Sequence, residues 1–471
     1  MARLGFADMA ISWLGQQTQK RVRYSPSNVY LEGVYKPVAQ ETTVSDLKVT
    51  GALPVELDGL LARIGPNPME VKNPAAYHWF LGDGMVHGIR LREGRAIWYR
   101  SRWVGTDSVN RRLHRPLAPG PRRGVVDTVN TNIIGHGGRL WAVTEAGVLP
   151  VEMDGELNTV RHGYFDSDYL RAITAHPHRD PDTGELHAIC YEARNPTRVH
   201  YAVIDANCRV QRMLDIPVRH GPMIHDCALT RKYVLVLDLP VTFSFREFLR
   251  GNGLPYRWNP SHPARVGLLP REGDANDIKW CALADPCYVF HPCNAFDEAD
   301  GRVVVDVVAH SRMFDAARTG FGPEEQRMSF ERWTLDPQRG TVARSVLSDR
   351  PQEFPRMDER RYTRSYRYAY TTGWGAGRPG PQPTLRYDLQ ENSTAEHHYG
   401  ADAVPGETVF VPKPNDAAED AGWLMTCVYR ANEDRSDVVI VDARNFGGDP
   451  LAVVHLPGRL PMGFHGNWIA D

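Results

Sequence analysis

The chain has 471 residues, with 55 basic and 57 acidic side chains and a sequence pI of about 6.8. This balance gives no basic surface for nucleic acid, so a small neutral molecule is the favoured partner. The length exceeds what one ordinary hydrophobic core supports, and we expect either several domains or a repeating all-β architecture. No linker or low-complexity run divides the chain, which favours one large domain.

The seven cysteines contain no C-x-x-C pair, and their odd number and irregular spacing do not indicate a disulfide framework. The first residues lack the apolar core of a secretory signal, and no stretch reaches the roughly 18 uncharged apolar residues of a membrane-spanning helix. These features predict a reducing compartment and a cytoplasmic protein.

The N-terminal segment 1–27 is predicted to be a helical or irregular extension. Residues 6–20 are expected to form a short amphipathic helix within it. The apolar side of this helix would be formed by Phe6, Met9, Ile11 and Leu14. Such a helix can pack on the protein's own surface or contact a membrane peripherally, and the sequence leaves both open.

Runs of β-branched and aromatic residues between turn signals recur along the rest of the chain, as is typical of strands. The clearest runs are residues 139–144, 200–204, 233–237, 302–308 and 437–441. Several are followed by turn residues and a second run, which is the pattern of consecutive antiparallel hairpins. The sequence therefore predicts an all-β fold in which no long helix is required.

Four histidines in widely separated segments have contexts that favour an imidazole directed inward. They are His176 in Ala-His-Pro, His225 in Ile-His-Asp, His291 in Phe-His-Pro and His465 in Phe-His-Gly. Imidazole nitrogens suit iron, zinc, copper and nickel, so the four together suggest one metal ion held by neutral ligands. A single buried histidine is more often a satisfied core residue, so only the complete set supports this interpretation.

Carboxylates are expected one layer further out, because a ligating histidine usually donates its other ring N–H to a carboxylate or carbonyl. Glu145, Glu353 and Glu407 lie in contexts that fit this role. The four histidines and three glutamates follow one another along the chain at intervals. Most of these intervals are about as long as one propeller blade, which is roughly 40–50 residues or more. A β-propeller would bring one inner strand per blade to a common axis, although a pair of β-sandwiches or a jelly roll remains open.

Further motifs are spread over nearly the whole chain. The most specific is His-Trp-Phe-Leu-Gly-Asp-Gly-Met at residues 78–85. Others are residues 28–33, 63–68, 130–132, 175–185, 222–226, 264–271, 290–295, 353–355 and 463–466. These motifs resemble those of the carotenoid cleavage oxygenases, a family that also includes stilbene-cleaving dioxygenases and retinoid isomerases.

The resemblance implies a seven-bladed β-propeller formed by residues 28–471, with loops and short helices forming a cap over one face. It implies one Fe(II) ion per chain and no other redox cofactor. The implied iron ligands are His176, His225, His291 and His465.

The resemblance also assigns roles around the ligands. Glu145, Glu353 and Glu407 would hold the ligating histidines, and the methyl group of Thr131 would crowd one open coordination position. His178 is expected at the surface, where similar sequences usually carry lysine. The histidines of the glycine-rich signature, His78 and His87, are expected to be structural.

One departure from the family concerns the substrate. Stilbene-cleaving members typically carry a lysine that binds a substrate phenol immediately before the glutamate corresponding to Glu145, whereas this chain has Thr144. The departure disfavours a phenolic stilbene without excluding it, because threonine can still make one neutral hydrogen bond. Tyr99 corresponds either to the tyrosine that assists this lysine or to a packed strand residue. Phe80 is a further candidate for substrate contact.

The aromatic segment 241–249 is expected to form a loop over one face, which would line a lipophilic tunnel, touch a membrane or cover an internal hydrophobic cluster. The resemblance predicts a non-haem Fe(II) dioxygenase that uses O2 to cleave a C=C bond of a small lipophilic carotenoid or apocarotenoid into two carbonyl products. A stilbenoid or phenylpropenoid (isoeugenol-like) alkene is the alternative substrate. A non-catalytic propeller that binds a ligand is the alternative from another class.

Overall fold

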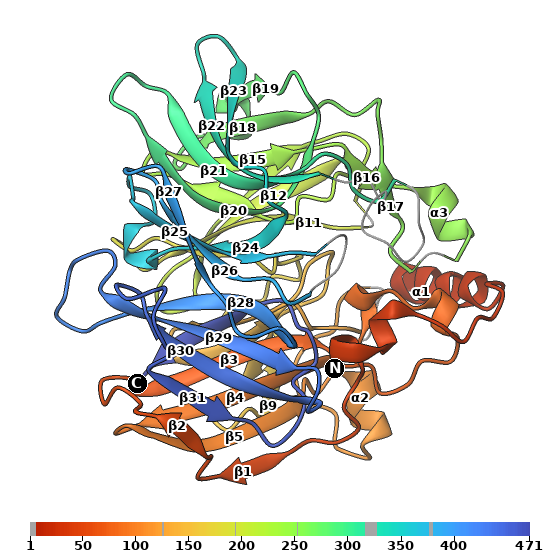
Figure 1. Ribbon diagram of the computed structural model, residues 1–471. Coiled ribbons are helices and arrows are strands. Elements are labelled where there is room, and N and C mark those ends of the chain that lie inside the picture. The colour runs from red at the N-terminus through yellow and green to blue at the C-terminus, as the bar shows by residue number, and fades with distance from the viewer. Residues whose placement is uncertain (1–5, 125–126, 194, 252, 316–326, 376–379) are drawn as a thin grey trace.

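The fold is all-β, with sheets in a β-propeller arrangement, in a computed structural model that describes residues 6–124, 127–193, 195–251, 253–315, 327–375 and 380–471 (Figure 1). The α-helices of the described residues are α1 (Phe6–Gln19), α2 (Asp107–Arg112) and α3 (Phe245–Leu249). They lie on one side of the sheets, to the right in Figure 1. Short 3-10 helices are η1 (Val29–Leu31), η2 (Gly33–Tyr35), η3 (Pro74–Ala76), η4 (Trp79–Leu81), η5 (Ala275–Asp277) and η6 (Glu359–Arg361).

Three of the sheets contain four strands each, connected in sequence order as hairpins. One consists of β6 (Asn132–His136), β7 (Arg139–Val143), β8 (Val151–Met153) and β9 (Thr159–His162). The second consists of β10 (His178–Arg179), β11 (Leu186–Tyr191), β12 (Arg198–Ile204) and β13 (Val210–Pro217). The third consists of β24 (Gln352–Arg356), β25 (Tyr368–Gly373), β26 (Thr384–Asp388) and β27 (Ser393–His397).

An eight-stranded sheet lies between the second and third of these along the chain. Its order is β14 (Cys227–Leu229), β15 (Tyr233–Asp238), β18 (Arg265–Pro270), β19 (Lys279–Ala282), β23 (Thr341–Ser348), β22 (Met328–Asp336), β21 (Val303–His310) and β20 (Tyr288–Asp297). Its two antiparallel halves meet in one parallel pair, Ala282 with Thr341. A separate ribbon is formed by β16 (Val241–Phe243) and β17 (Tyr256–Trp258).

Two five-stranded sheets combine the two ends of the chain. One has the order β1 (Thr43–Ser45), β5 (Arg95–Trp103), β4 (Gly84–Arg92), β3 (Gly59–Pro66) and β32 (Gly466–Ala470). The other has the order β2 (Val49–Gly51), β31 (Ala452–His455), β30 (Arg435–Asp442), β29 (Gly422–Arg430) and β28 (Ala403–Pro412). Because β32 pairs with β3 and β31 pairs with β2, backbone hydrogen bonds join the N-terminal and C-terminal parts.

The sheets present edge strands toward the centre of the molecule. These edge strands, with β32, contact one another in the order β10, β14, β20, β24, β28, β32 and β6. Between the sheets lie apolar side chains, and a strand such as β21 is buried along its whole length because sheets pack on both of its faces. The arrangement brings residues that are far apart in sequence to one axis.

The helix expected at residues 6–20 is confirmed as α1, although the side chains of Phe6 and Met9 lie outside the described part of the structure. The segment expected as an aromatic loop at 241–249 forms β16 and α3 instead, and Ser244 caps the helix by accepting a hydrogen bond from the Glu247 backbone. Within the described residues, we find no helix with the length and apolar character needed to cross a bilayer.

Candidate metal centre

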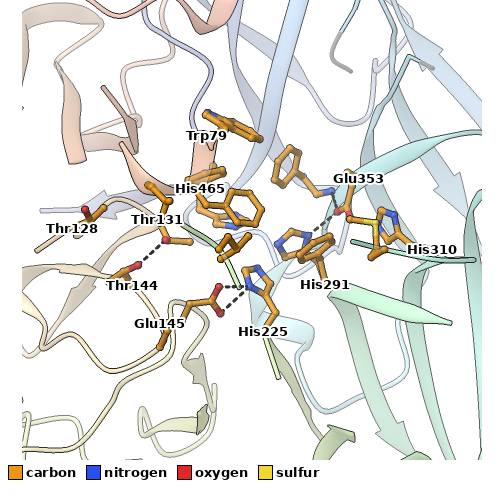
Figure 2. A pocket seen from close by; sticks show the side chains of 18 of the residues that line it. Trp79, Thr128, Thr131, Thr144, Glu145, His225, His291, His310, Glu353 and His465 are labelled. Atoms are coloured by element: carbon orange, nitrogen blue, oxygen red, sulfur yellow. Dashed lines mark hydrogen bonds and ion pairs between the residues drawn. The ribbon is translucent and has the colours of Figure 1, made fainter. Parts of the chain in front are cut away.

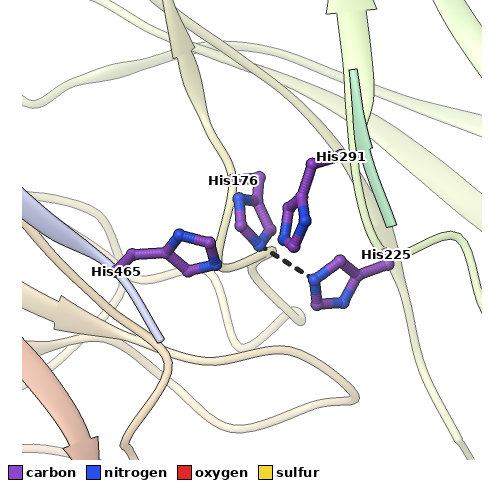
Figure 3. A group of neighbouring side chains, drawn as sticks. All are labelled: His176, His225, His291 and His465. Atoms are coloured by element: carbon purple, nitrogen blue, oxygen red, sulfur yellow. Dashed lines mark hydrogen bonds between the residues drawn. The ribbon is translucent and has the colours of Figure 1, made fainter. Parts of the chain in front are cut away.

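The four predicted histidines meet at the centre of the propeller. His176, His225, His291 and His465 are all buried, and each offers a ring nitrogen within 4.8 Å of the others (Figure 3). Two nitrogens that bind one metal ion at about 2.1 Å lie at most about 4.2 Å apart, so a small adjustment suffices to surround a single ion. The sequence therefore identified a real cluster of imidazoles.

Each of these histidines is placed by an edge strand. His176 and His225 come two residues before β10 and β14, His465 comes immediately before β32, and His291 lies inside β20. The pairing register of β20 shifts on both sides of Pro292, which has no N–H to donate to the ladder. Such a bulge turns a strand side chain away from its regular direction, here toward the axis.

The same device positions two of the predicted glutamates. The register of β24 shifts between Glu353 and Arg356, and the register of β28 shifts in the stretch that contains Glu407. Phe354 adopts a positive φ of 55°, which is a strained conformation for a bulky side chain. Strain next to the cluster indicates that the surrounding fold enforces the direction of these side chains.

Three glutamates bind the outward nitrogens of three histidines. The His225 Nδ1 atom lies 2.9 Å from Glu145 Oε2, His291 Nδ1 lies 2.7 Å from Glu353 Oε2, and His465 Nδ1 lies 2.9 Å from Glu407 Oε1. Because each Nδ1–H donates to a carboxylate, each Nε2 keeps its lone pair for the centre. His176 has no such glutamate, and its Nδ1 lies 3.7 Å from the Asp226 carboxylate.

The inward nitrogens have the environment that a cation would complete. The Nε2 atoms of His176 and His225 lie 3.1 Å apart, and His291 Nε2 is buried without a hydrogen-bond partner. Burial, followed by the neighbouring imidazoles, lowers the pKa of His176 well below its usual value. Burial likewise lowers the pKa of His465 to about 4. At His225 the Glu145 carboxylate outweighs burial and raises the pKa. The residues fit a metal ion because converging imidazole nitrogens are its ordinary ligands.

The glutamates differ in what holds them from outside. Glu407 also accepts hydrogen bonds from Arg356 Nε at 2.9 Å and from the Gly466 backbone at 2.8 Å. Burial would raise the pKa of Glu407, but Arg356 and then His465 outweigh it and hold that pKa well below its usual value. Among the described residues, the close hydrogen bonds of Glu145 come from His225, and the Tyr191 phenol is a more distant partner.

Glu353 has a second imidazole as its partner. The His310 Nε2 atom lies 2.6 Å from Glu353 Oε1, and the Phe354 backbone N–H donates to Glu353 Oε2 at 2.7 Å. Burial alone would raise the pKa of Glu353. The imidazoles of His291 and His310 outweigh burial and hold that pKa far below its usual value. Three carboxylates near one centre supply the negative charge that four neutral ligands lack.

Two cavities reach the cluster from different sides. The apolar cavity has a volume of about 130 Å³ and contacts His225, His291 and His465 (Figure 2). Its apolar wall consists mainly of Trp79, Phe80, Phe290, Phe354, Trp374 and Phe464. The polar cavity has a volume of about 1000 Å³ and contacts His176, His291 and His465. Its wall carries charged side chains, including Asp226, Arg356, Glu359 and Glu407.

The glycine-rich signature builds one wall of the apolar cavity. A Cβ atom at Gly84 would lie 1.7 Å from the Val129 carbonyl oxygen, so only glycine allows this close approach. The Asn130 side chain then donates to the carbonyl oxygens of Phe80 and Gly82 at 2.9 and 2.8 Å. These contacts hold Phe80 at the cavity.

Three other residues that the sequence predicted for the site line the apolar cavity: Phe80, Thr131 and Thr144. The Thr131 hydroxyl donates to Asn130 Oδ1 at 3.0 Å and lies 3.0 Å from the Thr144 hydroxyl (Figure 2). Both partners occupy the hydroxyl of Thr131, which leaves its methyl group for the cavity.

Two expectations from the sequence need correction. Tyr99 does not line the apolar cavity; it lies in β5, where its hydroxyl is 2.9 Å from His87 Nδ1 and its ring packs in a core between sheets. His178 is not at the surface, because its side chain is 12% exposed and its Nε2 lies 2.7 Å from Asp226 Oδ1. The polar contact with Asp226, next to His225 of the cluster, replaces the solvent that a surface residue would have. His78 and His87 are buried outside the cluster, in line with a structural role.

Sequence reasoning missed three residues of the site. Arg356 and His310 bind the outer sides of Glu407 and Glu353, and Tyr191 lines the apolar cavity. Arg356 follows the Glu-Phe-Pro motif by one residue, so its position was a usable signal. His310 and Tyr191 end ordinary strands, and their sequence contexts give no sign of the site.

Comparison with known proteins identifies the family of this chain. The family described as retinal pigment epithelial membrane protein matches residues 35–470. A carotenoid cleavage oxygenase of Mycobacterium tuberculosis is 41% identical, over 94% of this chain and 97% of the relative. The chain belongs to the carotenoid cleavage oxygenase family.

Other members of the carotenoid cleavage oxygenase family widen the range of named activities. An isoeugenol monooxygenase of Pseudomonas putida is 30% identical, over 93% of this chain and 97% of the relative. The crystal structure of a lignostilbene dioxygenase from Pseudomonas brassicacearum superposes with a TM-score of 0.84 and 28% identity, covering 96% of this chain and 100% of that one. These relatives are oxygenases, so membership in the family makes this chain an oxygenase as well.

Proposed function

We propose that this protein is an Fe(II)-dependent oxygenase that splits a C=C bond of a carotenoid or apocarotenoid into two carbonyl products. The observation that carries the proposal is the meeting of four buried imidazoles with an apolar cavity. His176, His225, His291 and His465 would hold one iron ion per chain. When bound, the ion would supply the one-electron and O2 chemistry that amino-acid side chains lack.

The side chains around the ion have separate tasks in this proposal. Glu145, Glu353 and Glu407 hold the Nδ1–H groups, so that the Nε2 lone pairs point at the centre. The aromatic wall, with Phe80 and Phe290, would orient the alkene and exclude water from it. Thr131 would present a methyl group and thereby limit what approaches the centre from its side.

A second substrate class is favoured by the size of the apolar cavity. Its volume of about 130 Å³ is close to the roughly 150 Å³ of a cavity that takes one benzene ring. A single-ring alkene, such as an isoeugenol-like phenylpropenoid, would place its double bond there without further opening, and a stilbenoid would place one of its rings there. A carotenoid would have to extend beyond the described cavity. A non-catalytic binding module is the weaker alternative, since such a protein has no need of a complete ligand set.

The finer architecture also belongs to this proposal. We propose seven blades, formed when the eight-stranded sheet is counted as two units that meet in the single pair Ala282 and Thr341. Residues 28–471 would form this one domain, and residues 1–27 an extension, because the strands nearest the two chain ends pair with each other.

We further propose a cytoplasmic protein with peripheral membrane contact. All seven cysteines are unpaired, which fits a reducing compartment. Helices α1 and α3 contact each other, and both expose large apolar side chains: Trp13, Leu14, Phe245 and Leu249. An apolar group of this kind could enter the interfacial region of a bilayer that stores a lipophilic substrate.

The test is incubation of the iron-loaded protein in air with a panel of carotenoids, apocarotenals, hydroxystilbenes and isoeugenol-like alkenes, with products identified by aldehyde mass. Oxygen-dependent formation of two carbonyl fragments from carotenoids or apocarotenals supports the first substrate class. Cleavage of the aromatic alkenes alone supports the second class. Absence of cleavage across the panel by protein that retains its iron would contradict the proposed activity and favour a binding module.

A further inference from the structure

The apolar cavity has one polar corner that the proposed reaction does not use. It is formed by Thr144, Glu145 and Tyr191, next to His225. The segments are adjacent, because the Ala193 backbone N–H donates to the Ala146 carbonyl oxygen at 3.4 Å. The corner therefore joins the end of β11 to the segment that follows β7.

The hydroxyl group of Tyr191 is the unusual feature of this corner. Tyr191 is only 3% exposed, and its buried hydroxyl makes no close hydrogen bond among the described residues, although the Glu145 carboxylate lies near it. The side chain nevertheless lines the apolar cavity. An unpaired buried hydroxyl costs free energy, so a residue in this state at a cavity wall indicates a group that a ligand completes.

Glu145 has the complementary property. Among the described residues its carboxylate accepts close hydrogen bonds from His225, with the Tyr191 phenol as a more distant partner, whereas Glu353 and Glu407 each accept close hydrogen bonds from three groups. A carboxylate offers about four acceptor positions, so Glu145 retains free capacity. Burial, followed by the nearby Glu145 charge, raises the pKa of Tyr191 well above its usual value, so the phenol stays protonated and can donate.

We infer that Tyr191 and Glu145 together bind a hydroxyl group of the substrate, so that the preferred substrate is a hydroxylated alkene. The Tyr191 O–H donates to the substrate oxygen, and the substrate O–H donates to the Glu145 carboxylate. A carbonyl oxygen satisfies Tyr191 only, and a methyl group satisfies neither. Tyr191 acts as a specificity-determining residue, and the inference deepens the proposed function by naming the substrate group that its site selects.

The test uses binding without turnover. Iron-loaded protein is titrated without oxygen with three ligands of similar size, 4-hydroxystilbene, 4-formylstilbene and 4-methylstilbene, and the dissociation constants are measured by calorimetry. We expect the hydroxyl ligand to bind about tenfold more tightly than the methyl ligand, which is the scale of one or two neutral hydrogen bonds. The formyl ligand is expected between them. In Tyr191→Phe the preference for hydroxyl over methyl should fall to about twofold or less, with binding of the methyl ligand unchanged.

A matched control is Tyr256→Phe. The ring of Tyr256 packs edge-on against Tyr191 at a centroid distance of 5.9 Å, but Tyr256 does not line the apolar cavity. This variant should keep the tenfold preference. Retention of the preference in Tyr191→Phe, or an equal loss of affinity for all three ligands, would overturn the inference. Equal affinity of the unmodified protein for all three ligands, as expected if only a water molecule bridges Tyr191 and Glu145, would overturn it too.

Failure of the inference about Tyr191 can be distinguished from failure of the proposed function. Iron content and oxygen-dependent cleavage of 4-methylstilbene are measured on the same preparations. If the unmodified protein shows the hydroxyl preference but neither retains iron nor cleaves any alkene, the proposed function fails while the binding corner stands. If it retains iron and cleaves alkenes without any hydroxyl preference, only the inference about Tyr191 fails.

Discussion

The apolar and polar cavities reach the same histidine cluster but offer it opposite surroundings. The apolar cavity, of about 130 Å³, is walled mainly by aromatic rings, and the polar cavity, of about 1000 Å³, is walled by side chains of both charges. His291 and His465 contact both. The difference teaches that one side of the cluster is built to exclude water from a lipophilic molecule, while the other holds the ligands in place by charge.

Two of the three glutamates, Glu145 and Glu407, follow the same division, whereas Glu353 lines the apolar cavity and is fully hydrogen-bonded. Glu145 lines the apolar cavity and has free acceptor capacity, whereas Glu407 lines the polar cavity and is held by Arg356. A carboxylate that is fully hydrogen-bonded serves its histidine only, but one with free positions can also meet a substrate. We therefore assign holding of ligands to the polar side and selection of substrate to the apolar side.

The largest expected effect comes from removing a ligand that both cavities share. His291→Ala should abolish iron retention and reduce alkene cleavage at least about a thousandfold, because the remaining imidazoles no longer surround the ion. Iron per chain and product formation provide the measurement, and circular dichroism should show an unchanged fold. His398→Ala is the control, because the His398 side chain is 66% exposed and is not a member of the histidine cluster. Normal cleavage by His291→Ala would refute the ligand assignment.

The next prediction compares how much a glutamate on the polar side and one on the apolar side contribute to the free energy of unfolding. Glu407→Gln removes the buried charged partner of the Arg356 guanidinium, whose side chain is 14% exposed, and leaves it only the half-exposed Glu359. We expect a loss of about 3 kcal/mol in the free energy of unfolding of the metal-free protein. Glu145→Gln only replaces the charge-assisted hydrogen bond to His225 by a neutral one and should cost about 1 kcal/mol. Urea titrations of the two variants give the comparison, and equal losses would contradict the assignment of holding to the polar side.

The histidines outside the cluster predict a pH dependence. Burial lowers the pKa of His78 to about 4, and burial together with Arg63 lowers the pKa of His87 to about 3, compared with 6.5 in the unfolded chain. Below pH 6.5 the unfolded chain therefore binds protons that the folded protein refuses, and stability present above pH 6.5 is lost as the pH falls toward these values.

Each such group contributes about 1.4 kcal/mol per unit of pKa difference. The thermal midpoint of the metal-free protein should fall steadily between pH 6.5 and pH 4. His87→Gln should flatten this fall, while the exposed His398→Gln should leave it unchanged. A midpoint that is constant over this range, or the same slope in His87→Gln, would show that burial does not keep these imidazoles neutral.

The smallest expected effect concerns Thr144. Thr144→Val removes the hydroxyl that lies 3.0 Å from the Thr131 hydroxyl but keeps the shape of the side chain. Thr131 retains its bond to Asn130, so we expect a change of about two- to fivefold in kcat/KM, the scale of part of one hydrogen bond. Thr128→Val, at the wall of the same cavity, should change kcat/KM by less. A loss beyond a hundredfold in Thr144→Val would mean that Thr144 itself takes part in the chemistry.

The sequence was sufficient to predict the histidine cluster because the contexts of its members are local. Each of the four histidines carries a neighbouring proline, glycine or aspartate that marks a break in a strand, and the structure places them at such breaks. The glycine-rich signature was equally readable, since Gly84 is required by the approach of Val129. The all-β class followed from the recurring strand patterns.

The remaining features depend on contacts between distant segments. Tyr99 seemed a cavity residue by its place in the chain, yet the pairing of β4 with β5 directs it to His87. His178 lacks any local sign of burial, because its partner Asp226 comes from the distant segment just before β14. Tyr191 and His310 become part of the site only when the edge strands assemble, so no pattern along the chain could reveal them.

The most direct test of the central claim is the metal content of the unmodified protein purified without oxygen. Mass spectrometry of the elements should find about one iron per chain, and the same preparation should release carbonyl products from an alkene once air is admitted. Zinc in place of iron, or no bound metal in a folded protein, would contradict the claim that these four histidines hold an iron ion between the apolar and polar cavities.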